Sequence, residues 1–129
     1  FIGSPKINTF AGLMSSEGRA SFLGIELDRQ FDAKPGNITV GLRPEHLSIA
    51  DEGQGLGMRI THMENLGSDY FVHGKTLDGN HDIIVRVLPS RARALARGQE
   101  VQVVRERGEA MIFGADKKRI RPLTEAAHG

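Results

Sequence analysis

The chain has 129 residues, a formal net charge of +1 and no cysteine. This length fits one domain, or two small subdomains that share a core. Without cysteine, disulfides and thiolate metal sites are excluded, and a reducing compartment is expected. Six Phe, one Tyr and no Trp leave little material for stacking on bases, and the charge excess is small for a nucleic-acid binder.

No apolar run approaches the roughly 20 residues that span a bilayer, and no signal-peptide pattern is present. We therefore expect a cytoplasmic chain. The sequence also begins without an initiator Met, which fits a fragment of a longer protein.

The first half of the chain predicts short strands, because apolar residues recur mainly at every second position. Residues 34–37 predict a turn, since Pro presets φ and Gly and Asn tolerate positive φ. Pro44 restricts Arg43 to extended backbone and favours a single helical turn after it. The strands expected here are 7–13, 20–27 and 38–42, with a loop at 51–57.

The second half predicts a meander of antiparallel strands. A four-residue loop at 66–69 places Asn65 opposite Tyr70, and Asp78-Gly79 is typical of a type I′ hairpin turn. The strands expected here are 58–65, 70–77, 81–88, 99–105 and 110–113. Seven to nine short strands predict an all-β protein, most economically a small barrel of the oligonucleotide/oligosaccharide-binding (OB) type.

The only helical pattern lies at 90–96, with Ser90 as a candidate N-cap and Gly98 as a stop. Beyond Arg121 the sequence is polar, so residues 122–129 are expected to form a flexible tail.

Motifs of catalysis are absent from the sequence. There is no phosphate-binding loop, no Gly-x-Ser-x-Gly elbow and no cysteine nucleophile. We therefore expect no catalytic and no cofactor-binding residues in this chain.

Two histidines form a candidate metal pair. Counting back from the loop at 66–69 puts His62 opposite His73, and directly paired side chains lie about 5 Å apart at Cβ. Two ligands are too few for a structural zinc site, and His81 falls opposite Thr76, away from the pair. An ordinary cross-strand pair is the favoured interpretation, and no metal site is predicted.

Three phrases resemble a known family when they are taken together. FIGSPKIN at 1–8 is similar to the phrase that ends the nucleotide-binding domain of maltose-type and glycerol-3-phosphate-type importer ATPases. VGLRPEHL at 40–47 and ENLGSDY at 64–70 resemble two signatures of the C-terminal regulatory domain of the same subunits. Most of the chain is covered, in the right order.

The resemblance implies an OB-like domain of the TOBE or molybdate-binding-protein-like type. Residues 1–8 would end the linker from a missing nucleotide-binding domain, and 9–121 would form the regulatory domain. ATP and Mg would bind to the missing domain. ATP hydrolysis there would drive uptake of sugars, polyols or glycerol-3-phosphate. Implied partners are a second ATP-binding subunit, the permease subunits and a regulatory protein, at the inner face of the cell membrane. Alternatives are an anion- or metabolite-binding module and, less favoured, a nucleic-acid-binding OB domain.

Gly67, Ser68 and Asp69 are the candidate contact with a partner. A glycine at a hairpin tip permits close backbone approach, and the two polar side chains beside it offer hydrogen bonds. A two-fold contact would use the same patch on both chains. The competing interpretation is that Gly67 only supplies the positive φ of the turn.

Arg43, Pro44 and Glu45 carry the family phrase at 40–47. We expect a structural role for them, with Arg43 and Glu45 paired across the loop that follows the strand, because exposed ion pairs rarely do more.

Overall fold

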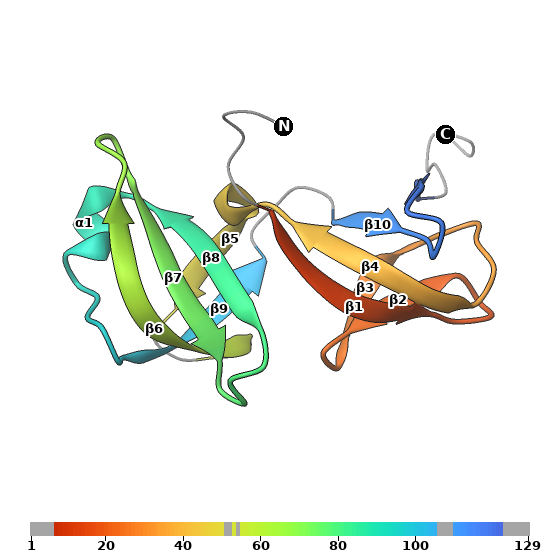
Figure 1. Ribbon diagram of the computed structural model, residues 1–129, viewed down its shortest axis with the longest axis horizontal. Coiled ribbons are helices and arrows are strands. Elements are labelled where there is room, and N and C mark those ends of the chain that lie inside the picture. Colours follow the sequence, from red (N-terminus) through yellow and green to blue (C-terminus); the bar gives the residue numbers. More distant parts are fainter. Residues whose placement is uncertain (1–6, 51–52, 54, 106–109, 123–129) are drawn as a thin grey trace. The chain divides into compact units, whose positions relative to one another are not determined.

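The structure is a computed structural model that describes residues 7–50, 53, 55–105 and 110–122 (Figure 1). The opening phrase at 1–6 and the tail residues 123–129 lie outside the described residues. Two compact units make up the chain. Unit 1 contains Phe1–Asn8 and Leu42–Glu109, and unit 2 contains Thr9–Gly41 and Ala110–Gly129. The expected domain at 9–121 spans parts of both units, and its boundaries stay a prediction.

Unit 1 is built on a five-stranded antiparallel sheet with the order β5-β9-β6-β7-β8. β8 also contacts β5, at the opposite edge, so the sheet curls into a barrel. In Figure 1, β6, β7 and β8 run side by side. The elements are η1 (Pro44–His46), β5 (Leu47–Ala50), β6 (Leu56–Asn65), β7 (Tyr70–Thr76), β8 (Asp82–Val87), α1 (Pro89–Ala92) and β9 (Glu100–Arg105).

The core of unit 1 follows from the two-residue period of its strands, which sends alternate side chains to one face. Its most deeply buried residues, each at most 1% exposed, are Met58, Ile60, Val72, Ile83, Val85 and Val101.

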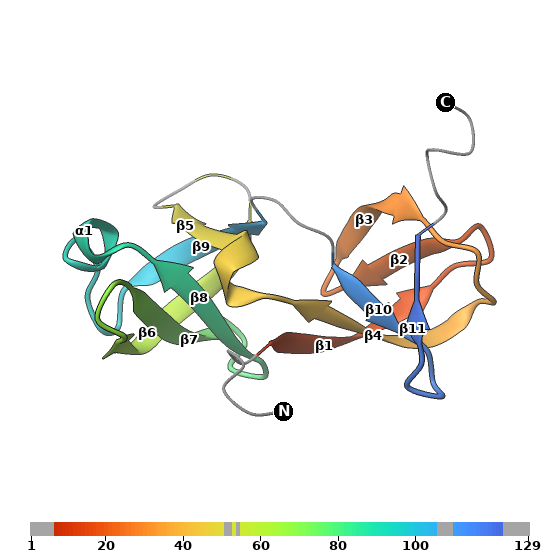
Figure 2. The same cartoon turned by 90° about the horizontal axis from the view of Figure 1, so that it is seen from above.

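Unit 2 is built on a six-stranded sheet with the order β11-β10-β4-β1-β2-β3, in which β10 lies between β4 and β11 (Figure 2). An isolated antiparallel bridge between Phe31 and Pro122 joins the chain beyond β3 to the chain beyond β11. The two edges of the sheet therefore meet. The strands are β1 (Asn8–Met14), β2 (Arg19–Phe22), β3 (Ile25–Gln30), β4 (Gly36–Leu42), β10 (Met111–Phe113) and β11 (Arg119–Ile120).

Aromatic packing fills part of the unit 2 core. The rings of Phe10 and Phe22 stack with their centroids 5.3 Å apart, and Ala20, Val40 and Ile112 of the same unit are fully buried. Gly12 lies within β1, where an added Cβ would stand 2.5 Å from the carbonyl oxygen of Ser21 on β2. Unit 2 thus depends on close backbone approach.

The all-β, OB-like fold predicted from the sequence is confirmed. The strand at 38–42 is observed, starting two residues earlier at Gly36. A helical turn follows Pro44 as expected. Within the described residues, no helix has the length and apolar character to cross a bilayer.

The predicted strand at 20–27 is wrong, because two strands occupy this stretch. Leu23, at φ +51°, and Gly24, at φ +80°, form a tight turn between β2 and β3. A leucine with positive φ carries a steric cost that sequence patterns do not anticipate. The two-stranded arrangement is held by pairing of β2 with β1 on one side and β3 on the other.

Three further features differ from what the sequence predicted: the helix N-cap and the strands β5 and β11. The helix is α1, which begins at Pro89 with Leu88 as its N-cap, so Ser90 is not the cap. Proline at the first helical position is favoured because it lacks the N–H that would be unpaired there. The short strand β5 was not expected, and neither was β11. Pro122, the first residue of the expected tail, is bridged to Phe31, and the tail stays a prediction.

Candidate functional site: the tip of the β6–β7 hairpin

The β6–β7 hairpin has the register that the sequence predicts. Asn65 faces Tyr70, and the backbone N–H of Leu66 donates to the carbonyl of Asp69 at 2.8 Å, which closes the four-residue tip. Gly67 adopts φ +96°, and its N–H donates to Oδ1 of Asn65 at 2.8 Å. The tip is therefore held by its own hydrogen bonds. Gly67 supplies the positive φ of the turn and is also accessible to a partner, because nothing lies within 4 Å of a Cβ added there. The two interpretations of Gly67 are therefore compatible.

Asp69 differs from the other two predicted contact residues because it is buried, at 9% exposure. Arg86 on β8 donates from Nε to Oδ2 of Asp69, and the Ser68 hydroxyl donates to Oδ1 at 3.4 Å. Charge-assisted hydrogen bonds of this kind are about twice as strong as neutral ones. Asp69 thus ties the tip to the neighbouring strand, while Gly67 and Ser68 remain exposed.

Two leucines, not singled out from the sequence, lie at the same end of the barrel. Leu66 is 41% exposed within the tip. Leu88, which directly follows the Val87 that pairs with Tyr70, is 67% exposed. Arg86 was also missed, although the register across the Asp78-Gly79 turn places it opposite Phe71, close to Asp69. That register was available from the sequence.

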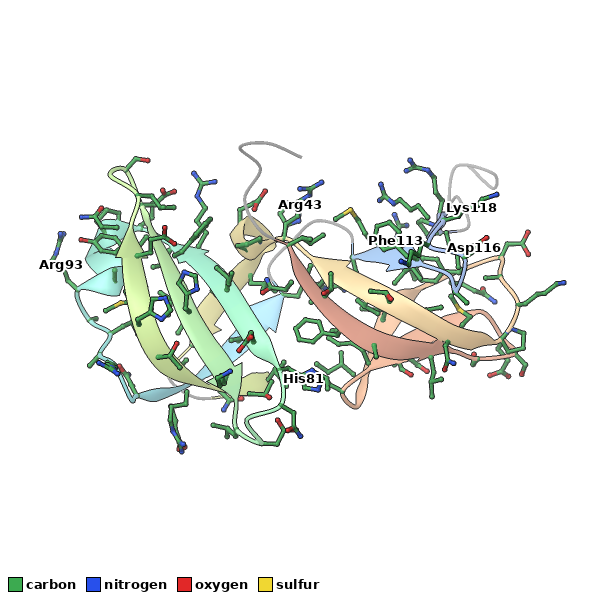
Figure 3. All side chains as sticks on the ribbon, viewed as in Figure 1. Arg43, His81, Arg93, Phe113, Asp116 and Lys118 are labelled. Atoms are coloured by element: carbon green, nitrogen blue, oxygen red, sulfur yellow. The ribbon has the colours of Figure 1, made fainter. Side chains whose placement is uncertain are left out.

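The Arg43–Glu45 phrase forms the entry to the barrel. Arg43 is extended, at φ −77° and ψ 141°, and its carbonyl accepts the N–H of His46 at 3.0 Å. Pro44 is less than 2% exposed, whereas the side chains of Arg43 and Glu45 are exposed; Figure 3 labels Arg43. Pro44 therefore packs in the core and fixes the turn. The pairing of Arg43 with Glu45 stays a prediction.

His62 lies opposite His73, as the register predicted. The two rings stack, with centroids 4.2 Å apart and planes 13° from parallel. His73 Nε2 lies 3.1 Å from Oε1 of Glu64, and Nδ1 of His62 lies 3.2 Å from the hydroxyl of Thr61. In the described part of the chain, no group of three or more His, Cys, Asp or Glu side chains could hold a metal ion.

A bulge accompanies the histidine pair. The register of β6 against β7 shifts by one between Ile60 and His62, and the Thr61 hydroxyl donates to the carbonyl of His73 at 3.1 Å. Bulges of this kind bend a strand and change the aim of its side chains.

The family is settled by comparison with known proteins. The model of the TOBE domain family matches residues 40–113. The chain belongs to the TOBE domain family. The matched segment contains the phrases at 40–47 and 64–70, so the resemblance inferred from the sequence is confirmed at the level of the family.

Curated relatives of this TOBE-domain chain are import ATP-binding proteins. An sn-glycerol-3-phosphate import ATP-binding protein UgpC from Yersinia pestis is 36% identical over 67% of this chain and 25% of its own length. The protein of the same name from Paracoccus denitrificans is 32% identical over 88% of this chain and 31% of its own length. The chain therefore spans about a quarter to a third of the curated relatives that it matches.

A solved structure supports the fold. The cytoplasmic molybdate-binding protein ModG, crystallised with molybdate bound, superposes with a TM-score of 0.61 over 87% of this chain and 98% of its own. At 13% sequence identity, this likeness bears on the fold alone.

Proposed function

We propose that this chain is the C-terminal regulatory and dimerisation domain of the ATP-binding subunit of an importer for sugars, polyols or glycerol-3-phosphate. The observation that carries the proposal is its similarity to import ATP-binding proteins over a limited part of their length. The chain has no phosphate-binding loop of its own. ATP and Mg would bind in a separate nucleotide-binding domain, and this chain would not hydrolyse ATP.

In this proposal, the full-length subunit lies in the cytoplasm against the inner face of the membrane. It contacts the permease through its nucleotide-binding domain and couples ATP hydrolysis to solute uptake. The TOBE-domain chain contributes contact with a second ATP-binding subunit and with a regulatory protein.

The β6–β7 tip is the proposed contact with a second copy. Leu66 and Leu88 supply exposed apolar area, and Gly67 allows a partner backbone to approach. Asp69 and Arg86 contribute indirectly, because their ion pair holds the tip against β8. A self-complementary patch with a small apolar centre is what a two-fold contact requires.

Sedimentation velocity of the chain over a wide concentration range tests this contact. We expect self-association that Leu66→Ser combined with Leu88→Ser weakens at least about tenfold, since loss of interface anchors costs about 1–2 kcal/mol or more. Leu77→Ser is the matched control, because Leu77 is 50% exposed but lies beyond the other end of β7. A chain that stays monomeric throughout would overturn the dimerisation role. An equal effect of Leu77→Ser would remove the tip as the interface.

A second candidate function is an anion-binding module. The fold match to a molybdate-binding protein favours it. Thermal unfolding of the chain with molybdate, tungstate and sulfate provides the test: a stabilisation specific to molybdate or tungstate supports this candidate, and an unchanged midpoint with all three contradicts it.

A further inference from the structure

Unit 2 contains a cavity of about 550 Å³ at one end of its sheet. β4 and β10 are antiparallel, with Phe113 opposite Thr39, so the start of β4 and the end of β10 lie at the same end. The loop at 33–35 before β4 and the turn at 114–118 between β10 and β11 both contribute to the lining. The volume falls in the range of roughly 300–1,000 Å³ that is typical of small-molecule pockets.

Three cations and one carboxylate lie around this cavity. Lys34 comes from the loop before β4, and Lys118 and Arg119 come from the β10–β11 turn and β11. All three residues are exposed. The carboxylate is that of Asp116, so the lining carries an excess of positive charge.

Asp116 forms a hydrogen bond within its own turn. Its Oδ1 accepts the backbone N–H of Lys118 at 2.9 Å, and Figure 3 labels both residues. The turn is closed by Gly114, whose N–H donates to the carbonyl of Lys118 at 3.0 Å and whose carbonyl accepts the N–H of Lys117 at 2.9 Å. Asp116 thus has a structural task, and its position next to Lys118 is fixed by the backbone.

The rest of the lining is largely apolar. Ile38 on β4 is buried at 6% exposure, and Ile120 on β11 is half-buried. Ala33, Pro35 and Ala115 add further carbon surface. A ligand that fits this arrangement needs an anionic end and a short carbon skeleton.

We propose that this cavity binds a small phosphomonoester, with the phosphate held by Lys34, Lys118 and Arg119 and the carbon skeleton against Ile38 and Ile120. A phosphate ester carries a charge of about −1.5 to −2 at neutral pH, which matches an excess of cations better than a monovalent carboxylate does. Arginine and lysine both form charge-assisted hydrogen bonds with phosphate. This site lies within unit 2, and it does not depend on the proposed dimer contact of unit 1.

Titration of the isotope-labelled chain with glycerol 3-phosphate, followed by NMR, tests the proposal. We expect chemical-shift changes concentrated at 33–38 and 114–120. Inorganic phosphate should bind more weakly, because it lacks the carbon skeleton, and glycerol should cause no change. Shifts that concentrate elsewhere, or inorganic phosphate binding as tightly as the ester, would overturn the assignment.

A pair of charge-neutralising variants sharpens the test. Lys118→Gln combined with Arg119→Gln should weaken binding of glycerol 3-phosphate at least about tenfold, because two charge-assisted contacts are removed. Lys117→Gln is the matched control: it removes a positive charge from the same turn, at a residue that does not line the cavity. It should leave the affinity within about twofold. Equal losses in both variants would indicate general electrostatic attraction and contradict a built site. The NMR spectrum of each variant reports directly whether the fold is retained.

Discussion

The two units close their sheets by different means. In unit 1, a side chain completes the open edge: Asn8 is 4% exposed, and its Nδ2 donates to the carbonyls of Leu42 at 3.1 Å and Ile84 at 2.8 Å. Its Oδ1 accepts the N–H of Ile84 at 2.6 Å. In unit 2, the equivalent closure uses backbone, through Phe31, which bridges to Pro122 and donates its N–H to the carbonyl of Gly18 at 2.8 Å.

The two closures should therefore be sensitive to different kinds of substitution. A side-chain closure is lost by removing a carboxamide, while a backbone closure is lost by adding an atom where two segments touch. Two substitutions test the comparison, and a third tests a turn of unit 1; they follow in decreasing order of expected effect.

Gly18→Ala should be the most damaging change, and it acts on unit 2. A Cβ at Gly18 would lie 2.2 Å from the carbonyl oxygen of Phe31, and the residue has φ +79°. A rigid clash with backbone combined with an unfavourable φ is expected to cost about 3 kcal/mol or more. Urea unfolding followed by hydrogen exchange would measure the free energy of unfolding and show which amides lose protection.

Gly24→Ala is the control for this prediction. Gly24 has nearly the same φ, +80°, but nothing lies within 4 Å of an added Cβ. Only the conformational cost of about 1–2 kcal/mol is expected. If both alanines cost the same, the contact with Phe31 is not what limits unit 2.

Asn8→Ala should come second, and it acts on unit 1. The substitution removes three hydrogen bonds: a buried one to the carbonyl of Leu42 and two part-buried ones to the N–H and carbonyl of Ile84. We expect a loss of about 2–3 kcal/mol, since unsatisfied buried groups cost about 1–3 kcal/mol. Hydrogen exchange should locate the loss at β8. Thr9→Ala, at the exposed neighbouring position, is the control and should change stability little. Protection lost first in unit 2 would contradict the assignment of Asn8 to the closure of unit 1.

Asp78→Asn should have the smallest effect, and it depends on pH. Hydrogen bonds from the Thr76 hydroxyl and then from the N–H of Asn80 lower the pKa of Asp78 below its ordinary value of 3.8. A lowered pKa in the folded state contributes stability that is present above the ordinary pKa and is lost as pH falls through the folded value.

The variant should therefore lie slightly below the wild type in stability at neutral pH and approach it under acid conditions below pH 3.8. Thermal unfolding across this acid range would measure the difference. Asp82→Asn offers a comparison, because Lys75 lowers the pKa of Asp82 through a hydrogen bond and a charge interaction. A stability difference that is constant with pH would contradict the proton linkage at Asp78.

The hairpins of unit 1 were predictable from the sequence because their turns are chemically explicit. A four-residue loop and an Asp-Gly turn fix a register by counting, and the observed pairs Asn65–Tyr70 and His62–His73 follow from it. The bulge at Thr61 was not predicted, and it does not disturb that part of the count. The position of the hairpin tip was predicted, and its role as a contact stays a prediction. The burial of Asp69 was not predicted, because it depends on Arg86 from another strand.

Unit 2 was less predictable because its short strands and tight turns form through pairing with neighbouring strands and not from an explicit turn sequence. The positive φ of Leu23 is tolerated only because β2 and β3 pair on either side of it. β11 has two residues, Arg119 and Ile120, and it forms through pairing with β10. No local sequence pattern predicts the positive φ of Leu23 or the strand β11. β5 is different, because the apolar residues Leu47 and Ile49 alternate in the sequence, as is typical of a strand, and both are buried.

The carboxamide of Asn8 has a consequence for solubility. β8 ends its sheet, and an exposed row of backbone donors and acceptors on such a strand invites pairing with extended segments of other chains. Asn8 occupies both backbone groups of Ile84 at the middle of that row. The Asn8 side chain should therefore hinder aggregation through this edge. We expect a chain without it to pair with strands of other chains under conditions in which it is still folded.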